Sequence, residues 1–587
     1  MKPAWVWEVS FECGNKVGGI WTVITSKAET MKKIFGDHYI TVGFYDPRKV
    51  EMLKEEPPEW LKKIFVKLEK LGLRFHYGKW IEGGNVNLIL IDSNEFERKH
   101  VNEIKKTFWE TYRIDSLFAG PDYNEPLAWS YAAGMLIEEA AKITTGIDVA
   151  HFHEWLSGGG LLYLAMKRAN VPTVFTTHAT VLGRALGGKV DGVDPEQEAR
   201  EMGVIAKHLT EKAAAVNADV FTTVSDVIGE EVKKVLGRKP DIITYNALDE
   251  TKLDDLSQLI RTKFKLREKL EEFLKAYFLP YYSMNFEDYP IIYTSGRYEF
   301  YNKGFDLFIK ALGYANQKLK ESNSSKWVAA FLLVPAGTLG VKDEVIQNFV
   351  VYRRMKELLL EDVGKMTEKV VNIIQDEKAA SEQLSEIILD LKRLGMRFMS
   401  RRGKTPPLCP FQLSYREEED MILQELKRNG LLNREEDRVK VIFYPVYLNR
   451  QDELLGMRYI DFITAGSMGI FLSRYEPWGY TPLEAAAYLS VAVTTNISGF
   501  GRAVKLRLGK KAEGIKVVEM NEKVHEKVGK LIVDFASSPK DVRLEMEINA
   551  HKTARIFTWK KMIRRYVKAY ELAVGRFARK IALSETA

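Results

Sequence analysis

Cysteine is scarce in this chain, which contains only Cys13 and Cys409. Two cysteines are too few for a disulfide framework or a cysteine-based zinc module, and this scarcity is typical of proteins in a reducing cytosol. No apolar run approaches the roughly 18 residues that a membrane helix needs. The first residues also lack a basic segment followed by a cleavage site of small residues. We therefore expect a cytoplasmic protein with no membrane partner.

An excess of charge of one sign is also missing. The 87 basic and 80 acidic side chains nearly cancel, which leaves a net charge of +7. A balance this close does not produce the strong basic field that nucleic-acid binding requires, so no nucleic-acid partner is expected. The 587 residues exceed the roughly 250 to 300 at which a single hydrophobic core stops growing. The length therefore predicts at least two domains.

Short apolar runs bounded by turn residues alternate with helical stretches in the first half of the chain. Continuous apolar strands separated by helices are typical of a parallel sheet covered on both faces. The predicted strands are residues 4–9, 39–45, 86–91, 149–153, 173–177, 220–224 and 242–245. Residues 1–285 are therefore predicted to form a first doubly wound, Rossmann-like α/β domain.

A second series of such strands begins after a charged helix at residues 253–279. The predicted strands are residues 291–295, 328–334, 439–444, 468–473, 491–495 and 515–519. Residues 286–555 are predicted to form a second doubly wound domain that faces the first across a cleft. We place the hinge between the domains near residues 246–290 and at the point where the C-terminal helix crosses back.

About 100 residues inside the second series, 339–438, show no strand signal. Apolar residues recur there at helical spacing, as at Ile346, Phe349 and Val350. A connection of this length predicts an inserted helical element. It would serve either as packing or as an arm through which the chain forms a homo-oligomer.

The C-terminal segment, residues 556–587, has the pattern of an amphipathic helix with a basic outer face. Its apolar positions are Ile556, Trp559, Ile563, Tyr566, Val567 and Tyr570, and the basic residues between them are Lys560, Lys561, Arg564 and Arg565. Binding to a membrane surface is one interpretation, but an aromatic stripe of this kind more often packs on the protein's own body. We expect the latter.

Chemistry-bearing residues gather where the predicted strands of the first domain end, which is where open α/β sheets bind ligands. A glycine loop with Lys16, Gly18 and Gly19 follows the first strand and starts a helix, whose free N–H groups would favour an anionic or strongly polar group. His151 and His153 end the fourth strand. A zinc site is an alternative for this His-x-His pair, although no third ligand is evident nearby, and a hydrogen-bonded core histidine is another. His178 ends the next strand.

In the second domain, Arg297 follows a strand and Lys303 precedes a helix. A forked guanidinium and an ammonium beside flexible glycines suit a diphosphate, although a lone cation is usually a solvated surface charge.

The most informative segment, residues 474–484, links a strand to a helix. The pattern from Thr481 to Glu484 is that of a capping box with Thr481 as the N-cap, in which Glu484 would only close the helix. This interpretation leaves Glu476 unexplained, because Glu476 lies on the loop beside the N–H groups of residues 479–481. A helix N-terminus that can hold phosphate, between two carboxylates that can hold hydroxyls, predicts a nucleotide-sugar site.

With these residues in view, the chain resembles the glycogen synthases of the animal and fungal type, which are retaining glucosyltransferases of the GT-B fold. The matching segments lie in family order from residue 15 to residue 501: NKVGGI, AHFHEW, VFTTHATVLGR, TTVSD, SGRYEFYNKGFD, SRYEPWGYTPLEAAA and TTNISGFG. The resemblance therefore covers nearly the whole chain.

The resemblance implies transfer of glucose from UDP-glucose or ADP-glucose, with retention, to the non-reducing 4-hydroxyl of an α-1,4-glucan such as glycogen. It implies catalytic roles for Lys16, His153 and Glu476, with His153 at the transferred glucose. The remaining implied contacts to substrate come from Gly18, Gly19, His178, Arg297, Lys303, Gly479, Tyr480, Thr481 and Glu484. Arg297 and Lys303 would hold the diphosphate, and Glu484 the ribose hydroxyls. No metal and no other cofactor is implied.

Two alternatives remain open from the sequence. The chain could be another retaining GT-B transferase whose acceptor is a small sugar or sugar phosphate. It could also be an inactive glucan-binding scaffold that keeps the fold, although an inactive protein has no reason to keep all the charged groups of the site.

Overall fold

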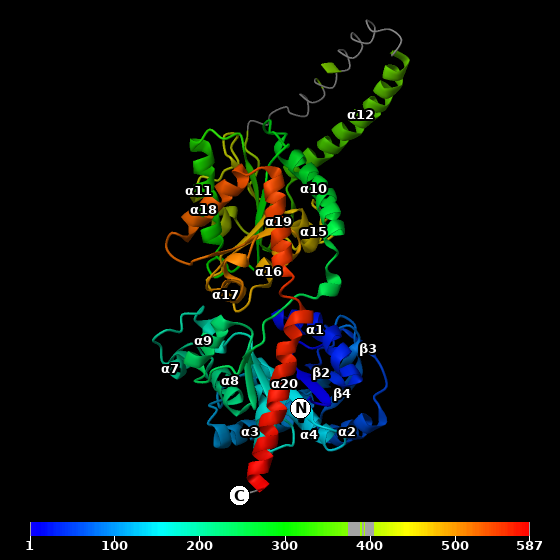
Figure 1. Ribbon diagram of the computed structural model, residues 1–587, viewed down its shortest axis with the longest axis vertical. Helices are drawn as coiled ribbons and strands as arrows, with labels where there is room; N and C mark the ends of the chain where they lie inside the picture. The colour runs from blue at the N-terminus through cyan, green and yellow to red at the C-terminus, as the bar shows by residue number, and fades with distance from the viewer. Residues whose placement is uncertain (1, 374–387, 390–392, 394–403, 453, 586–587) are drawn as a thin grey trace.

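A computed structural model of the chain describes residues 2–373, 388–389, 393, 404–452 and 454–585. These residues form two α/β lobes, each built around its own sheet, which follow one another along the long axis of the molecule (Figure 1). The predicted architecture of two doubly wound domains is confirmed.

The first lobe contains a nine-stranded sheet in the order β3-β4-β5-β2-β1-β6-β7-β8-β9. Its strands are β1 Trp5–Val9, β2 Tyr39–Phe44, β3 Met52–Lys54, β4 Arg74–Trp80, β5 Val86–Asp92, β6 Asp148–His153, β7 Thr173–Thr177, β8 Val220–Thr223 and β9 Ile242–Ile243. All seven predicted strands are present and pair in parallel. β3 and β4 were not predicted, and they form an antiparallel edge beside β5. β4 buries only Gly78 and Trp80, so it has no continuous apolar run that would mark it in the sequence.

Helices cover both faces of this sheet (Figure 1). They are α1 Gly19–Phe35, α2 Glu59–Glu69, α3 Asn94–Tyr112, α4 Pro121–Ala141, α5 Glu154–Met166, α6 Val181–Ala185, α7 Pro195–Glu201, α8 Ile205–Asn217 and α9 Asp226–Val235, with short 3₁₀ turns at Gly36–His38 and Glu250–Lys252. The helix α10, Leu256–Phe278, follows the first lobe in sequence but packs against α15, Tyr459–Ala465, of the second lobe. The predicted boundaries 1–285, 286–555 and 556–587 stay predictions.

The second lobe contains a fully parallel six-stranded sheet in the order β14-β11-β10-β15-β16-β17. Its strands are β10 Ile291–Ser295, β11 Val328–Leu333, β14 Val439–Tyr444, β15 Met468–Phe471, β16 Val491–Thr495 and β17 Ile515–Val518, all of them predicted. Its other helices are α11 Phe305–Glu321, α14 Met421–Arg428, α16 Tyr480–Ala487, α17 Gly499–Arg507, α18 Val524–Ser537 and α19 Lys540–Ala554, with 3₁₀ turns at Glu417–Glu419 and Gly509–Lys511.

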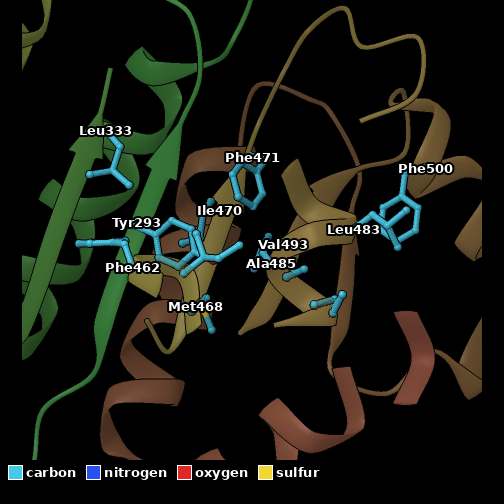
Figure 2. Close-up of a cluster of buried hydrophobic side chains, with 14 of the residues drawn as sticks. Tyr293, Leu333, Phe462, Met468, Ile470, Phe471, Leu483, Ala485, Val493 and Phe500 are labelled. Carbon is cyan, nitrogen blue, oxygen red and sulfur yellow. The ribbon is translucent and has the colours of Figure 1, made fainter. Parts of the chain in front are cut away.

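The core of the second lobe fixes the helix that carries the candidate nucleotide-sugar segment. Tyr293 meets Phe462 and Phe471 edge-on, with ring centroids 5.7 and 6.1 Å apart. Leu483 of α16 and Phe500 of α17 join the same cluster of buried side chains (Figure 2). Burying a side chain of this size contributes about 1.5 to 3 kcal/mol, so Leu483 anchors α16 in the core of the second lobe.

Two short strands in the connection between β11 and β14, β12 Thr338–Val341 and β13 Phe411–Leu413, pair antiparallel at the base of the insertion. The expectation of no strand here was wrong, because three or four residues are too few to show a β pattern. The helix α12, Asp343–Ile373, then leads away from the lobe (Figure 1). Phe349 packs on Phe273 with ring centroids 5.4 Å apart, whereas Ile346 and Val350 are 46% and 60% exposed. The part of the predicted helical insertion at residues 374–387, 390–392 and 394–403 lies outside the described residues.

The C-terminal helix α20, Trp559–Glu585, returns to the first lobe and packs on α1 and on strands β6 to β9 (Figure 1). Its predicted apolar stripe faces inward, since Trp559, Tyr566 and Tyr570 are almost fully buried. The two crossings between the lobes lie side by side: the N–H of Leu248 donates to Phe557 O, and the N–H of Trp559 donates to Leu248 O. No helix in the described part of the chain is long and apolar enough to span a membrane.

Candidate active site

A cleft of about 690 Å³ lies between the lobes, at the ends of the strands where a site was predicted. Nine predicted site residues line it: Gly18, Gly19, His178, Arg297, Lys303, Glu476, Gly479, Tyr480 and Thr481. The structure thus brings together motifs that are hundreds of residues apart in sequence. The remaining three, Lys16, His153 and Glu484, lie beside the cleft or behind its wall.

Lys303 and Glu476 meet in the second-lobe wall of the cleft. The Lys303 ammonium donates to Glu476 Oε2 at 2.6 Å, and the Ser473 hydroxyl donates to the same oxygen at 3.2 Å. Gly304 places the lysine: its φ is 69°, and a Cβ there would lie 2.0 Å from the Leu472 carbonyl oxygen at the end of β15. Only glycine allows this approach, so Lys303 is fixed beside Glu476.

Arg297 is the more exposed cation of the pair that was predicted for a diphosphate. Its guanidinium forms a 2.8 Å ion pair with Glu299, and its side chain is 76% exposed. Both residues line the cleft. An exposed ion pair of this kind contributes little to stability, so Arg297 can exchange Glu299 for a ligand at low cost.

The helix α16 directs its N-terminus at the cleft. Gly479 is its N-cap, with a φ of 103°, and no side chain caps the helix. The predicted capping box was therefore wrong: Thr481 lies inside the first turn. The glycine permits a sharp reversal that starts the helix two residues earlier, and Pro482 is tolerated in the first turn, where its missing N–H has no partner to lose. The N–H groups of Tyr480 and Thr481 remain available to an anion.

Glu484 lies one turn further along α16 and has no role in capping. Burial raises the pKa of its carboxyl to about 7. Among the described residues, no group donates a hydrogen bond to this carboxylate and no cation pairs with it. A largely buried carboxylate without a partner is costly unless a ligand completes its hydrogen bonds.

The glycine loop of the first lobe is already engaged by a carboxylate that the sequence did not reveal. Glu12 Oε2 accepts hydrogen bonds from the N–H groups of Gly18 and Trp21, both at 2.8 Å. The expectation of free N–H groups at the start of α1 was therefore wrong in part, because the chain supplies its own anion there. Lys16 is exposed, and its ammonium lies 4.7 Å from the centroid of the Trp21 ring.

Three buried carboxylates accept hydrogen bonds from the backbone of the segment that carries His178 and leads to Arg184. Glu154 accepts from the N–H groups of His178 and Ala179 at 3.0 and 3.1 Å. In the same way Glu211 accepts from Val181 N–H at 2.9 Å, and Glu231 accepts from Thr180 N–H at 3.1 Å. Burial raises the pKa of all three carboxyls. Arg184, 3.6 Å from Glu154, lines the cleft as a cation that the sequence analysis did not single out.

His151 is a core histidine, as one interpretation of the sequence proposed. Its Nδ1 lies 3.0 Å from the Tyr570 hydroxyl of α20, and its Nε2 lies 2.7 Å from Thr176 Oγ1. Both ring nitrogens are satisfied, so His151 ties β6 to β7 and to the C-terminal helix.

His153 is also buried, with 1% of its surface exposed. Its Nδ1 lies 2.9 Å from His178 Nε2, and its Nε2 lies 2.7 Å from Glu8 Oε1. His178 therefore stands at the cleft, and His153 stands behind it. Glu8 was missed by the sequence analysis, although a lone carboxylate inside the apolar run of β1 was the available signal.

The third ligand that the zinc interpretation lacked is present in space, because Glu8, His151 and His153 place their ligand atoms within 4.8 Å of one another. However, the ammonium of Lys27 pairs with Glu8 at this point. Both residues are completely buried. The cation that balances Glu8 is therefore a lysine of the chain itself, and each histidine nitrogen already has a protein partner.

Contacts between the lobes close one side of the cleft. The Ser225 hydroxyl donates to Pro477 O at 2.6 Å, and the Tyr475 hydroxyl donates to Glu231 Oε1 at 3.1 Å. The loop that carries Glu476 is thus attached to the first lobe on both sides of that residue.

Known proteins resemble this chain over nearly its whole length. A family model described as glycogen synthase matches residues 8–584. The chain is 32% identical to a glycogen [starch] synthase of Neurospora crassa, over 97% of this chain and 84% of that protein. It is 31% identical to isoform 1 of glycogen [starch] synthase from Saccharomyces cerevisiae, over 97% of this chain and 86% of that protein. It is also 31% identical to a glycogen [starch] synthase of Caenorhabditis elegans, over 97% of this chain and 88% of that protein.

Among solved structures, the catalytic domain of starch synthase IV from Arabidopsis thaliana, bound to ADP and acarbose, aligns with a TM-score of 0.52 and 13% identity. The alignment covers 98% of this chain and all of that one. It supports the predicted GT-B fold.

Proposed function

The chain belongs to the glycogen synthase family and is a hexosyltransferase of glycogen synthesis, and we propose that its cleft binds UDP-glucose in preference to ADP-glucose, as the resemblance to the animal and fungal type implies. The reaction would transfer glucose, with retention, to the non-reducing 4-hydroxyl of an α-1,4-glucan. The observation that carries the site assignment is the convergence of Lys303, Glu476 and the uncapped N-terminus of α16 in one cleft.

Arg297, Lys303 and the first N–H groups of α16 would hold the diphosphate. Negative charge grows on the leaving diphosphate as the glycosidic bond breaks. Cations and helix N–H groups that are already in place stabilise this charge more in the transition state than in the ground state. Arg297 would leave Glu299 to reach the phosphates, because its side chain is the more exposed of the two cations.

Glu476 and His178 would face the transferred glucose. Glu476 lies beside Lys303 in the second-lobe wall, and His178 lies in the opposite wall of the cleft. The contact with glucose that the resemblance implies for His153 would reach the sugar through His178, which lies between His153 and the cleft.

Glu484 would accept hydrogen bonds from the two ribose hydroxyls. Its carboxylate has no other donor in the described chain, and burial favours its neutral form until a ligand arrives. A cis-diol offers two donors to one carboxylate, and this pairing would repay the cost of burial.

Lys16, Gly18 and Gly19 would close over the donor and the glucan acceptor from the first lobe. Gly18 and Gly19 line the cleft, while Lys16 rests on the Trp21 ring at the surface. A movement of this loop toward the second lobe would carry the Lys16 ammonium to the reacting groups.

The exposed apolar side chains of α12 support a homo-oligomer. Ile346, Val350 and Val351 are 46%, 60% and 46% exposed on a helix that leads away from the body (Figure 1). A surface of this kind is stabilised when a second copy covers it. We also infer a cytoplasmic location, because Cys13 and Cys409 are both free buried thiols.

Competition between the two donors tests the proposed function. Purified protein with a glycogen primer is given equal labelled UDP-glucose and ADP-glucose, and incorporation into the polymer is measured without added metal. We expect label from UDP-glucose to dominate and Glu476→Ala to incorporate about 100-fold less. Equal or greater incorporation from ADP-glucose would reverse the donor assignment. A parallel reaction offers glycogen and a sugar phosphate together, and preferential transfer to the sugar phosphate would overturn the acceptor assignment.

A further inference from the structure

A buried chain of three side chains connects the centre of the first sheet with the cleft. Glu8 Oε1 lies 2.7 Å from His153 Nε2, and His153 Nδ1 lies 2.9 Å from His178 Nε2. Glu8 lies on β1, His153 ends β6 and His178 directly follows β7, and these three strands are neighbours in the sheet. His178 alone of the three lines the cleft.

The first member of this chain can only accept hydrogen bonds. Burial pushes the pKa of Glu8 upward, but the Lys27 ammonium and the hydrogen bond from His153 hold the pKa of that carboxyl well below its ordinary value. Lys27 and the Tyr39 hydroxyl both donate to Glu8. The Lys27 ammonium also lies 4.1 Å from the centroid of the Tyr566 ring of α20. Glu8 is therefore an ionised carboxylate, and the proton on the Glu8–His153 hydrogen bond belongs to His153 Nε2.

Because Glu8 is ionised, it determines which nitrogen of each imidazole carries a proton. Burial lowers the pKa of His153 and holds that of His178 well below its ordinary value, so both rings are neutral and carry one proton each. The proton of His153 is on Nε2, so its Nδ1 has a free lone pair. That lone pair can accept only from a proton on His178 Nε2, which leaves Nδ1 of His178 without a proton.

The other groups near these hydrogen bonds do not compete for the protons of His153 and His178. His151 stands 3.8 Å from Glu8 Oε1, but its nitrogens are engaged by Tyr570 and Thr176. Glu154 accepts from the backbone of His178 and does not contact its ring. Glu8 and its partner Lys27 therefore determine the donor and the acceptor of each hydrogen bond from Glu8 through His153 to His178.

We propose that Glu8 is a positioning residue that acts through His153 to hold His178 in the tautomer whose unprotonated Nδ1 accepts a hydrogen bond from a hydroxyl of the transferred glucose. This inference rests on the proposed function of the cleft. An imidazole with a fixed tautomer binds the hydroxyl without reorganisation, whereas a ring free to exchange tautomers presents an N–H to the same hydroxyl part of the time.

The test compares Glu8→Gln with the double variant Glu8→Gln/Lys27→Met, which removes both members of the buried ion pair and so avoids an unpaired lysine. The chain has only nine histidines, so protein with nitrogen-labelled histidine allows each ring to be assigned by nuclear magnetic resonance. We expect wild-type His178 to show a protonated Nε2 and a bare Nδ1. We expect the variants to show a mixture of tautomers, with kcat reduced about 10- to 100-fold.

The control is His208→Gln, which changes a buried histidine on α8 that contacts neither the cleft nor Glu8 and should change neither the His178 signals nor kcat. Binding of UDP, measured by calorimetry, should stay within about threefold in all variants, because the nucleotide groups lie in the other lobe. A protonated Nδ1 on wild-type His178 would overturn the proposal, as would an unchanged tautomer and kcat in a folded double variant. If wild-type protein transfers no glucose, the proposed function fails, while the tautomer measurement still decides whether Glu8 controls His178.

Discussion

The ammonium of Lys303 lies 2.6 Å from Glu476 Oε2, so the cation expected to hold the diphosphate and the carboxylate expected to face the glucose form one ion pair. Both side chains are about one-fifth exposed in the wall of the cleft. In the proposed function, their proximity would join leaving-group stabilisation to sugar binding in a single pair of residues.

This pair predicts strongly non-additive effects of substitution. Lys303→Gln and Glu476→Gln should each lower kcat about 100- to 1,000-fold, because each removes a charge that acts in the transition state and leaves its partner unbalanced. The double variant should lose much less than the product of the two effects. Steady-state kinetics of the four proteins measures this. Lys318→Gln, which breaks an exposed ion pair on α11, is the matched control and should retain full activity. Additive losses would show that the two side chains act independently.

Glu484 predicts that donor binding strengthens as pH rises through about 7. The pKa of this carboxyl is raised to about 7 in the free protein, so it is mostly protonated below that pH and ionised above it. Only the ionised form would accept hydrogen bonds from both ribose hydroxyls of the proposed donor. The KM for the donor should therefore fall about tenfold between pH 6 and pH 8, and Glu484→Gln should abolish this pH dependence while raising KM. A pH profile that is the same in both proteins would contradict the assignment.

His208 predicts a loss of stability in mild acid. It is completely buried on α8, neither ring nitrogen has a hydrogen-bond partner among the described residues, and its pKa is lowered to about 4. Because the folded-state pKa lies below the unfolded value of 6.5, the unfolded chain binds the proton first, and stability falls as pH drops below 6.5.

Between pH 7 and pH 5 the wild type should lose about 2 kcal/mol more of its free energy of unfolding than His208→Gln does. Urea unfolding at the two pH values measures this difference. Equal losses in the two proteins would show that His208 does not contribute.

The paired crossings at Leu248 and Thr558 predict the position of the hinge. Donor and glucan together should draw the lobes closer by a rotation about these two chain segments. Small-angle scattering should then record a smaller radius of gyration. Ser225→Ala removes the hydrogen bond to Pro477 O and should make the unliganded protein more open. Scattering curves that neither the ligands nor this substitution alters would show that the lobes do not move.

The exposed face of α12 predicts the route of assembly. Val350→Asp places a charge on an apolar residue that is 60% exposed and should lower the molar mass measured by light scattering to that of a single chain. The substitution lies far from the cleft, so the monomer should keep its fold. A mass that is unchanged by Val350→Asp would exclude this face as the interface.

Local sequence pattern predicted every parallel strand of both sheets and the strand ends at which the candidate site lies. Every strand of the second sheet was predicted, because buried parallel strands are continuous apolar runs that turn residues delimit. The motifs lie at strand ends, and parallel strands direct these ends to one edge, so the sequence alone predicted that Arg297, Lys303 and Glu476 share one cleft. The antiparallel edge strand β4 was missed because its polar, half-exposed residues resemble those of a loop.

The contacts that make the site specific come from the packing of distant segments. Glu8 and His153 are 145 positions apart and Lys303 and Glu476 are 173 apart, and no local pattern specifies which side chains meet over such separations. The N-cap of α16 is Gly479 and not Thr481, and this position likewise depends on how the loop before the helix is held against the first lobe. Sequence periodicity is a property of neighbouring residues, whereas the direction of a buried hydrogen-bond chain is set by charges that only the folded protein brings together.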